Sequence, residues 1–168
     1  NGVSIIDNTI NVFRKIFSEI IIVSNTPHKY VYTGIRVVSN LIPGSGALGG
    51  LYTGIHKACS KKCFAVACDM PFISEELIRY IISITGYDAV IPRVNGYYEP
   101  LFSMYSKACE DIIRKQLEAG NFKINDFYSE VNVREVPGDE LRLFDETLAS
   151  FINVNSAEDL KGITKMEI

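Results

Sequence analysis

Asp69 is the residue with the clearest chemical potential in this sequence. It follows Cys63-Phe-Ala-Val-Ala-Cys68, an apolar run typical of a buried strand, and it precedes Met70-Pro71. Proline keeps the preceding residue extended, so a helix cannot begin at Met70 and the carboxylate stays at the strand end. Mg²⁺ in proteins is typically held by one or two carboxylates plus substrate phosphate oxygens. Asp69 is therefore the candidate metal ligand and catalytic residue; the alternative is an aspartate that caps the helix expected from Ser74.

A glycine-rich loop follows another strand-like run. The stretch Gly44-Ser-Gly-Ala-Leu-Gly-Gly50 contains four glycines in seven residues and opens a predicted helix. Glycine lets backbone approach a ligand, and helix N-termini attract anions, which makes Gly46 a candidate nucleotide contact. The loop is not a P-loop, because the Lys-Ser/Thr pair is missing. The alternative role of these glycines is tight packing of helix against sheet.

Four asparagines are candidate ligand contacts. Asn25 and Asn40 each end a strand-like run, where an amide offers a donor and an acceptor to a base edge. Asparagine is also common in turns, which is the alternative for both. Asn153 and Asn155 lie two apart and so share one face of an extended segment, although Asn155 also stands where a last helix would start.

Strands alternate with helices through the first 90 residues. This order predicts an α/β fold of βαβ units, a mainly parallel sheet with helices on both faces. Ligands bind such sheets at the carboxyl ends of strands, so the crevice is expected over Asn25, Gly46 and Asp69. The helices are predicted at 5–17, 48–58, 74–84, 106–119 and from 156, with a short one at 124–128, and the strands at 19–23, 34–38, 63–68, 89–91, 97–105 and 131–136.

Length, charge and cysteine usage limit the number of domains, the class of function and the cellular location that we expect. The 168 residues predict a single domain spanning 1–168. The net charge of −3 argues against a dedicated nucleic-acid binder, and no apolar run reaches the length of a membrane span. The four cysteines lack zinc-site spacing, which favours reduced thiols and a cytoplasmic location.

Three motifs together resemble one family, the molybdenum cofactor guanylyltransferases. They are Pro43-Gly-Ser-Gly-Ala-Leu-Gly-Gly-Leu51, Val66-Ala-Cys-Asp-Met-Pro-Phe72 and Phe151-Ile-Asn-Val-Asn-Ser-Ala-Glu-Asp-Leu160, and the likeness extends over nearly the whole chain. The resemblance implies a Rossmann-like fold of the nucleotide-diphospho-sugar transferase type. It also implies transfer of GMP from GTP to the phosphate of molybdopterin, with Mg²⁺ as cofactor, pyrophosphate as product, and contacts with other cofactor-biosynthesis or acceptor proteins.

Carried over residue by residue, the resemblance gives roles to several positions. Asp69 matches the family's Mg²⁺-binding aspartate, and Asn153 and Asn155 match asparagines placed near the active site. Asn25 falls in the loop of the base pocket. Lys123 stands where arginines often line the pterin side, which keeps a cation but not the bidentate fork.

The sequence also departs from the family pattern. Asn40 replaces an aspartate that contacts guanine in the family. An amide cannot accept two hydrogen bonds from guanine as a carboxylate does, so the sequence leaves open whether the nucleotide is GTP or CTP. Glu99 stands where a histidine often precedes the proline. The family's opening strand and phosphate loop, Leu-Ala-Gly-Gly-x-Ser-x-Arg-Met-Gly-x-x-Lys, has no match.

The chain opens at Asn1-Gly-Val-Ser, which resembles the segment just after that loop, so we expect the N-terminal strand and phosphate loop to precede the residues shown. Two alternatives follow. One is a cytidylyltransferase or sugar-phosphate nucleotidyltransferase of the same fold, and the other is a nucleotide-binding module without catalysis.

Overall fold

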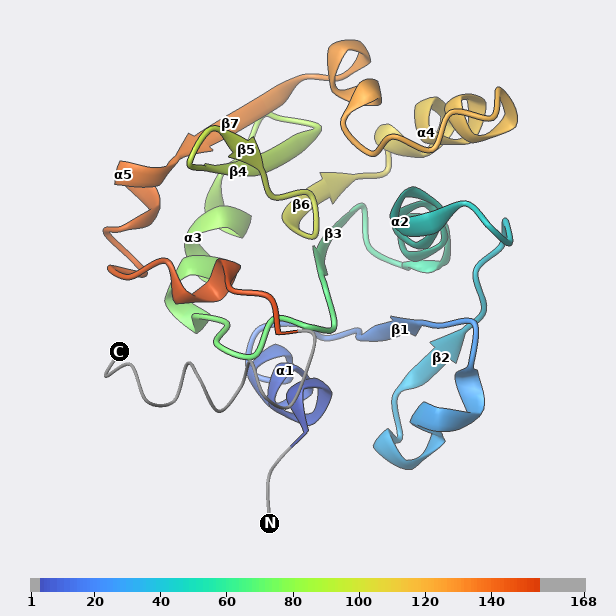
Figure 1. The fold of residues 1–168 in the computed structure, drawn as a ribbon, viewed down its shortest axis with the longest axis horizontal. Coiled ribbons are helices and arrows are strands. Elements are labelled where there is room, and N and C mark those ends of the chain that lie inside the picture. Colours follow the sequence, from blue (N-terminus) through green and yellow to red (C-terminus); the bar gives the residue numbers. More distant parts are fainter. Residues whose placement is uncertain (1–3, 155–168) are drawn as a thin grey trace.

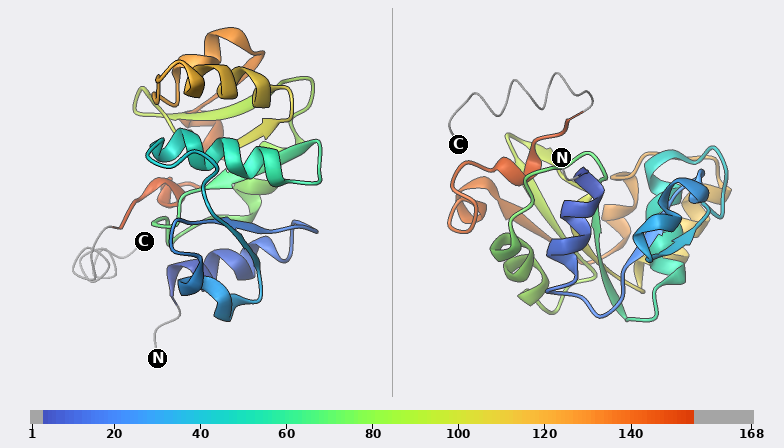
Figure 2. Two further views of the ribbon diagram at one scale, coloured as in Figure 1. Left: turned by 90° about the vertical axis from the view of Figure 1, so that its right-hand side faces the viewer. Right: turned by 90° about the horizontal axis from the view of Figure 1, so that it is seen from below.

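The computed structural model describes residues 4–154 and places strands between two groups of helices (Figures 1 and 2). The strands are β1 (Ile21–Val23), β2 (Arg36–Val38), β3 (Lys62–Val66), β4 (Ala89–Val94), β5 (Tyr97–Tyr98), β6 (Phe102–Ser106) and β7 (Val133–Pro137). The helices are α1 (Ile5–Phe13), α2 (Gly46–Lys57), α3 (Glu75–Ser83), α4 (Cys109–Glu118) and α5 (Gly138–Leu141), with short 3₁₀ helices at Pro27–Thr33, Asp126–Glu130 and Ala149–Phe151.

The strands form two separate sheets in the described part of the chain. β1 and β2 pair in parallel. In the larger sheet β6 lies between β3 and β4 and is antiparallel to both, β5 is antiparallel to β4, and β7 is parallel to β4. The α/β class is confirmed, but the prediction of a mainly parallel sheet is wrong for β5 and β6.

A tight turn explains the antiparallel strands. Asn95 and Gly96 both have left-handed φ angles, 51° and 86°, and join β4 directly to β5. An Asn-Gly pair with this geometry is the favoured two-residue hairpin turn. The chain therefore reverses at residue 95 and returns as β6, instead of crossing over through a helix as the parallel pattern required.

Helices cover both faces of the larger sheet, as predicted. Side chains of β4 alternate between two buried clusters: Val90 packs with α1 and α3, whereas Ala89 and Ile91 pack with α2 and α4. This alternation follows from the two-residue period of a strand. It explains why β4, buried on both faces, is the centre of the core.

Element boundaries follow local hydrogen bonding. The helix expected to reach residue 17 ends at Phe13, because Lys15 and Ile16 donate to carbonyls three residues back. Ser74 caps α3 as predicted, with its Oγ accepting from Leu77 N at 3.2 Å. The helix expected from Ser156 lies outside the described residues, and no described helix is long and apolar enough to cross a membrane.

A cavity of about 480 Å³ separates the two sheets. β1 lines one side and β3 the other, while α1 and α2 supply the remaining walls. Most of its lining is apolar, with residues such as Ile10, Phe13, Ile22, Leu51 and Val66. Within residues 4–154, therefore, one edge of β1 and one edge of β3 face this cavity without a strand partner.

Candidate functional site

Asp69 lies where two cavities meet. It lines the large cavity between the sheets and a smaller one of about 220 Å³, and Ala67 and Leu101 are also shared by both. Its Oδ1 atom is buried and has no hydrogen-bond partner among the described residues. An unsatisfied buried polar atom costs about 1–3 kcal/mol, and more if the group is charged. A cation bound at this carboxylate would offset that cost, so the site fits a metal ligand of the Mg²⁺ type.

The loop carrying Asp69 is fixed by the last described segment of the chain. The Asp69 carbonyl accepts from Val154 N at 2.8 Å. Ser150 Oγ accepts from Ser74 N at 2.9 Å and donates to the Phe72 carbonyl at 3.3 Å. These bonds bring Asn153 to the smaller cavity, which it lines together with Asp69, and the role that the resemblance assigns to it stays a prediction. Because Ser74 caps α3, the alternative role of Asp69 as that cap is not needed.

Glu99 completes the lining of the smaller cavity and was not among the predicted site residues. Its side chain is half-buried, and this burial raises the pKa of the carboxyl above its ordinary value. Its backbone is held at both ends, since Glu99 N donates to the Pro92 carbonyl at 2.9 Å and its own carbonyl accepts from Ser103 Oγ at 2.6 Å. Its place on the same cavity wall as Asp69 depends on the β3–β6 pairing, which no local sequence pattern reveals.

The glycine-rich loop is packed tightly onto α2. Ser45 is fully buried, and a Cβ atom on Gly49 would lie 1.6 Å from Ser45 Oγ. Gly44 and Gly46 adopt left-handed φ angles of 79° and 59°. Gly49 therefore packs against the loop that precedes α2, and not against the sheet as the alternative interpretation expected. Gly46 is exposed at the start of α2 and lines neither cavity, although its neighbour Ala47 lines the large one together with Asp69.

Asn40 joins this loop to α2 through its amide. Its Oδ1 accepts from Ile42 N at 3.0 Å and from Thr53 Oγ1 at 3.2 Å, while Nδ2 donates to Ser45 Oγ at 3.5 Å. Thr53 is fully buried, and its Oγ1 accepts from Leu41 N at 3.0 Å. Its one hydroxyl hydrogen is shared between Asn40 Oδ1 and the nearer Gly49 carbonyl, at 2.8 Å. The amide oxygen of Asn40 is thus already engaged inside the protein.

The structure does not bring every predicted residue to the cavities. Asn25 is exposed in the turn after β1, and Lys123 is exposed in the loop after α4, with its backbone N bonded to Asn121 Oδ1 at 3.0 Å. Neither lines a cavity. Asn155 lies outside the described residues. The ligand contacts assigned to these three residues stay predictions.

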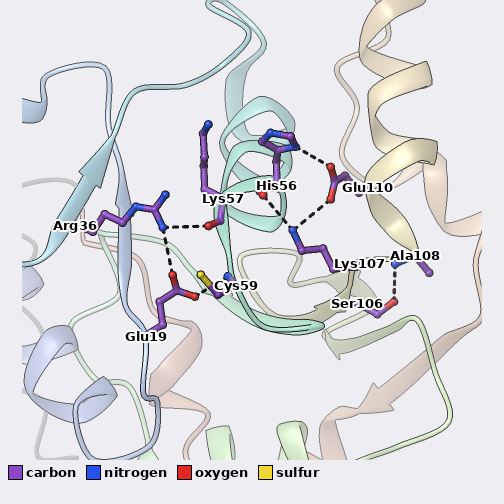
Figure 3. A network of polar contacts seen from close by, with 9 residues as sticks. All are labelled: Glu19, Arg36, His56, Lys57, Cys59, Ser106, Lys107, Ala108 and Glu110. Carbon is purple, nitrogen blue, oxygen red and sulfur yellow. Dashed lines mark hydrogen bonds and ion pairs between the residues drawn. The ribbon is translucent and has the colours of Figure 1, made fainter.

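The far end of α2 is anchored by a polar network (Figure 3). Its last carbonyls, on His56 and Lys57, accept from Lys107 Nζ at 3.1 Å and Arg36 Nη1 at 3.2 Å. His56 Nδ1 lies 2.7 Å from Glu110 Oε1. Cations at a helix C-terminus satisfy orphan carbonyls and complement the helix dipole. The network therefore fixes α2, and with it the glycine-rich loop at the other end.

Comparison with known proteins identifies the family. Residues 1–133 match the family model described as the MobA-like NTP transferase domain. The chain belongs to this family.

Relatives extend the MobA-like match along the chain. A probable molybdenum cofactor guanylyltransferase of Pelotomaculum thermopropionicum is 40% identical over 150 residues, covering 89% of this chain and 73% of that protein. Another, of Natranaerobius thermophilus, is 40% identical over 171 residues, covering 98% of this chain and 83% of the relative. This MobA-like chain thus matches most of the length of both relatives.

A solved MobA-like structure shares the fold. The molybdopterin-guanine dinucleotide biosynthesis protein A of Archaeoglobus fulgidus superposes with a TM-score of 0.75 at 27% identity, covering 94% of this chain and 86% of that one. The mixed arrangement of strands described above is therefore accommodated within a nucleotidyltransferase fold, and the family assignment and the architecture agree.

Proposed function

We propose that the chain is the body of a guanylyltransferase that joins GMP from GTP to a molybdopterin-type acceptor and releases pyrophosphate. The observation that carries the proposal is the buried, unpartnered Oδ1 of Asp69 at the meeting point of two cavities beyond β3. It is supported by membership of the MobA-like family and by relatives 40% identical that are named for this activity.

The chemistry asks mainly for positioning and charge neutralisation. An oxygen of the acceptor phosphate attacks the α-phosphorus of GTP, a new P–O bond forms, the bond to the β-phosphate bridging oxygen breaks, and pyrophosphate carries away the electron pair. The attacking oxygen is already anionic, so no strong general base is needed. Asp69 would hold Mg²⁺, which when bound neutralises phosphate charge. The loop bonds from Val154 and Ser150 keep Asp69 in place without a rearrangement on binding.

Asn40 gives a specific reason to keep the cytidylyltransferase alternative. Recognition of guanine by a carboxylate uses acceptors for N1–H and N2–H₂. Asn40 Oδ1 already accepts from Ile42 N and Thr53 Oγ1, and its Nδ2 atom is a donor. Because Ile42 N already uses one lone pair of this oxygen, Asn40 has fewer acceptors for guanine than a carboxylate, and a strong preference for GTP would need other contacts.

The cavity between β1 and β3 has the position and lining expected for a missing strand of the sheet. Its two unpaired strand edges and apolar walls suit one additional β-strand, and the loop that follows such a strand would emerge near Asp69, Ala47 and Gly50. We propose that the family's opening strand and phosphate loop, which lie outside this sequence, occupy this place. The phosphate loop would then supply the lysine that the present chain does not provide.

Nucleotide transfer to purified molybdopterin tests the activity. The chain, extended at its N-terminus by the family's strand and loop, is given α-labelled GTP or CTP. GTP is expected to be the better donor, and Asn40→Asp should raise the GTP preference about tenfold, because an ionic acceptor is worth about 1–2 kcal/mol more than a neutral one. A tenfold preference of the parent for CTP would establish the cytidylyltransferase instead. Binding of either nucleotide without transfer would favour the alternative of a nucleotide-binding module without catalysis.

A further inference from the structure

Two carboxylates line the smaller cavity, and neither has a polar partner. Asp69 and Glu99 make no side-chain hydrogen bond and no ion pair within residues 4–154, and the Oδ1 atom of Asp69 is buried. The other carboxylates without a side-chain partner in this part of the chain are all exposed to solvent: Glu76, Glu130, Asp139 and Glu146. Asp69 and Glu99 are set apart because they are partly buried and still have no partner.

The pairing of β3 with β6 brings these two residues to the same cavity. β3 and β6 are antiparallel, with Val66 paired to Phe102. The pairing continues one step beyond both strands, because Ala67 N donates to the Leu101 carbonyl at 2.9 Å. Beyond this bond both segments turn away from the ladder, and Asp69 and Glu99 both line the smaller cavity there.

Two carboxylates that line one cavity repel each other when both are charged, unless something neutralises them. Burial worsens the effect, because it removes the water that would screen the two carboxylates. Here the backbone nevertheless holds Glu99 firmly, through its bonds with Pro92 and Ser103. A divalent cation between the two carboxylates removes the repulsion and uses oxygen ligands, which hard cations prefer.

We propose that Glu99 is a second carboxylate ligand of the divalent cation that Asp69 holds, and that Asn153 contributes a neutral amide oxygen on the same wall. This inference rests on the proposed function, in which the cation accompanies the nucleotide. The described residues contain no group of three or more histidine, cysteine, aspartate or glutamate side chains able to hold a metal alone. A site of two carboxylates and an amide leaves its remaining positions to phosphate oxygens and water, as Mg²⁺ sites at nucleotides usually do.

Mn²⁺ binding to the purified chain tests the proposal without any assay of activity. Free Mn²⁺ is measured by electron paramagnetic resonance during titration of the parent chain, Glu99→Gln, Asp69→Asn and the control Glu76→Gln. Glu76 is an exposed carboxylate at the start of α3, so its change removes the same charge away from the cavity. Glu99→Gln is expected to weaken Mn²⁺ binding about tenfold or more, the range found when groups that support a metal site are removed. Glu76→Gln should leave it unchanged.

The melting temperature separates a ligand from a merely structural residue. If Glu99 serves the cation, Glu99→Gln relieves repulsion, so the metal-free variant melts at or above the parent temperature and gains less on addition of Mn²⁺. If Glu99 serves only the fold, the metal-free variant melts lower, and its Mn²⁺ affinity stays that of the parent. That second result overturns the inference.

The Asp69→Asn variant distinguishes a failure of the Glu99 inference from a failure of the proposed function. Loss of Mn²⁺ binding in Asp69→Asn with full binding in Glu99→Gln leaves the proposed function standing and removes Glu99 from the site. Full binding in both variants overturns the inference and also removes Asp69 from the metal assignment on which the proposed mechanism depends.

Discussion

At the scale of single residues, the four cysteines occupy two contrasting environments. Cys59 and Cys68 are exposed, whereas Cys109 is fully buried and Cys63 is partly buried in β3. Burial raises the pKa of Cys63 to about 12 and that of Cys109 to about 11. Only the thiolate is a good nucleophile, so these two groups become reactive only as the pH rises towards those values.

Alkylation at pH 8 should therefore modify Cys59 and Cys68 and spare Cys63 and Cys109. Iodoacetamide labelling followed by peptide mass spectrometry measures each site separately. Cys68 precedes Asp69, so a nucleotide bound with Mg²⁺ should slow labelling of Cys68 and leave Cys59 unaffected as an internal control. Equal labelling of all four thiols in the folded protein would contradict the burial, and equal protection of Cys59 would contradict the placement of the nucleotide.

At the scale of elements, local sequence signals located most helices and strands but not their pairing. Ser74 predicted the start of α3, and the apolar run ending at Cys68 predicted β3, because caps and periodicity are properties of neighbouring residues. The Asn95-Gly96 pair also predicts a hairpin, but the alternation of strands and helices favoured a parallel sheet instead.

Among the site residues too, local sequence signals identify some residues, whereas others depend on contacts between distant parts of the chain. Asp69 stands out because a strand end and a proline surround it. Glu99 does not, since its position beside Asp69 comes from the antiparallel register of β3 with β6. Asn40 stays a predicted ligand contact, and the structure adds that its amide packs the loop on α2 together with Gly49, a role that no local pattern indicates.

Gly49 gives a prediction for the glycine-rich loop. A methyl group at this position would meet Ser45 Oγ at 1.6 Å and Asn40 Nδ2 at 3.0 Å, and Ser45 is buried with no room to move. Gly49→Ala should destabilise the protein by about 1–3 kcal/mol, the usual cost of overpacking. It should also displace the loop and weaken nucleotide binding. Thermal and urea unfolding measure the first effect, and nucleotide titration measures the second.

Gly50→Ala is the matched control in the same helix turn. No atom lies within 4 Å of a Cβ built on Gly50. Alanine also favours a helix over glycine by about 1 kcal/mol. The control should therefore equal or exceed the parent in stability. A Gly49→Ala variant as stable as Gly50→Ala would show that the loop yields easily, and that its close packing on α2 is not what requires glycine.

At the scale of the whole molecule, the separation of the two sheets is the dominant feature. Within residues 4–154, β1 and β3 present open edges to one apolar cavity, and α1 and α2 line its remaining walls. Unpaired strand edges with apolar side chains favour pairing with another strand. One strand of five or six residues, at about 3.3 Å per residue, would match the length of β3.

An N-terminal extension that carries an apolar strand should therefore complete the sheet. Burying three of its aliphatic side chains would contribute about 1.5–3 kcal/mol each before the entropy of ordering the strand is subtracted. Ordering five or six residues costs about 1–2 kcal/mol each, so the two contributions nearly cancel. Each net kcal/mol raises the melting temperature of a protein of this size by about 2–4 °C, so a rise of a few °C at most is expected. Hydrogen exchange should slow at the backbone amides of β1 and β3, and binding of a hydrophobic dye to the cavity should fall.

The control extension has the same length and loop, but asparagine and serine replace its apolar strand residues. It should leave the melting temperature, the exchange of β1 and β3, and dye binding as they are in the parent chain, because it offers nothing to bury. Equal stabilisation by both extensions would mean that the added segment packs elsewhere. Unchanged exchange in β1 and β3 with the apolar extension would rule out the cavity as the place of the strand, and with it the route by which a phosphate loop reaches Asp69.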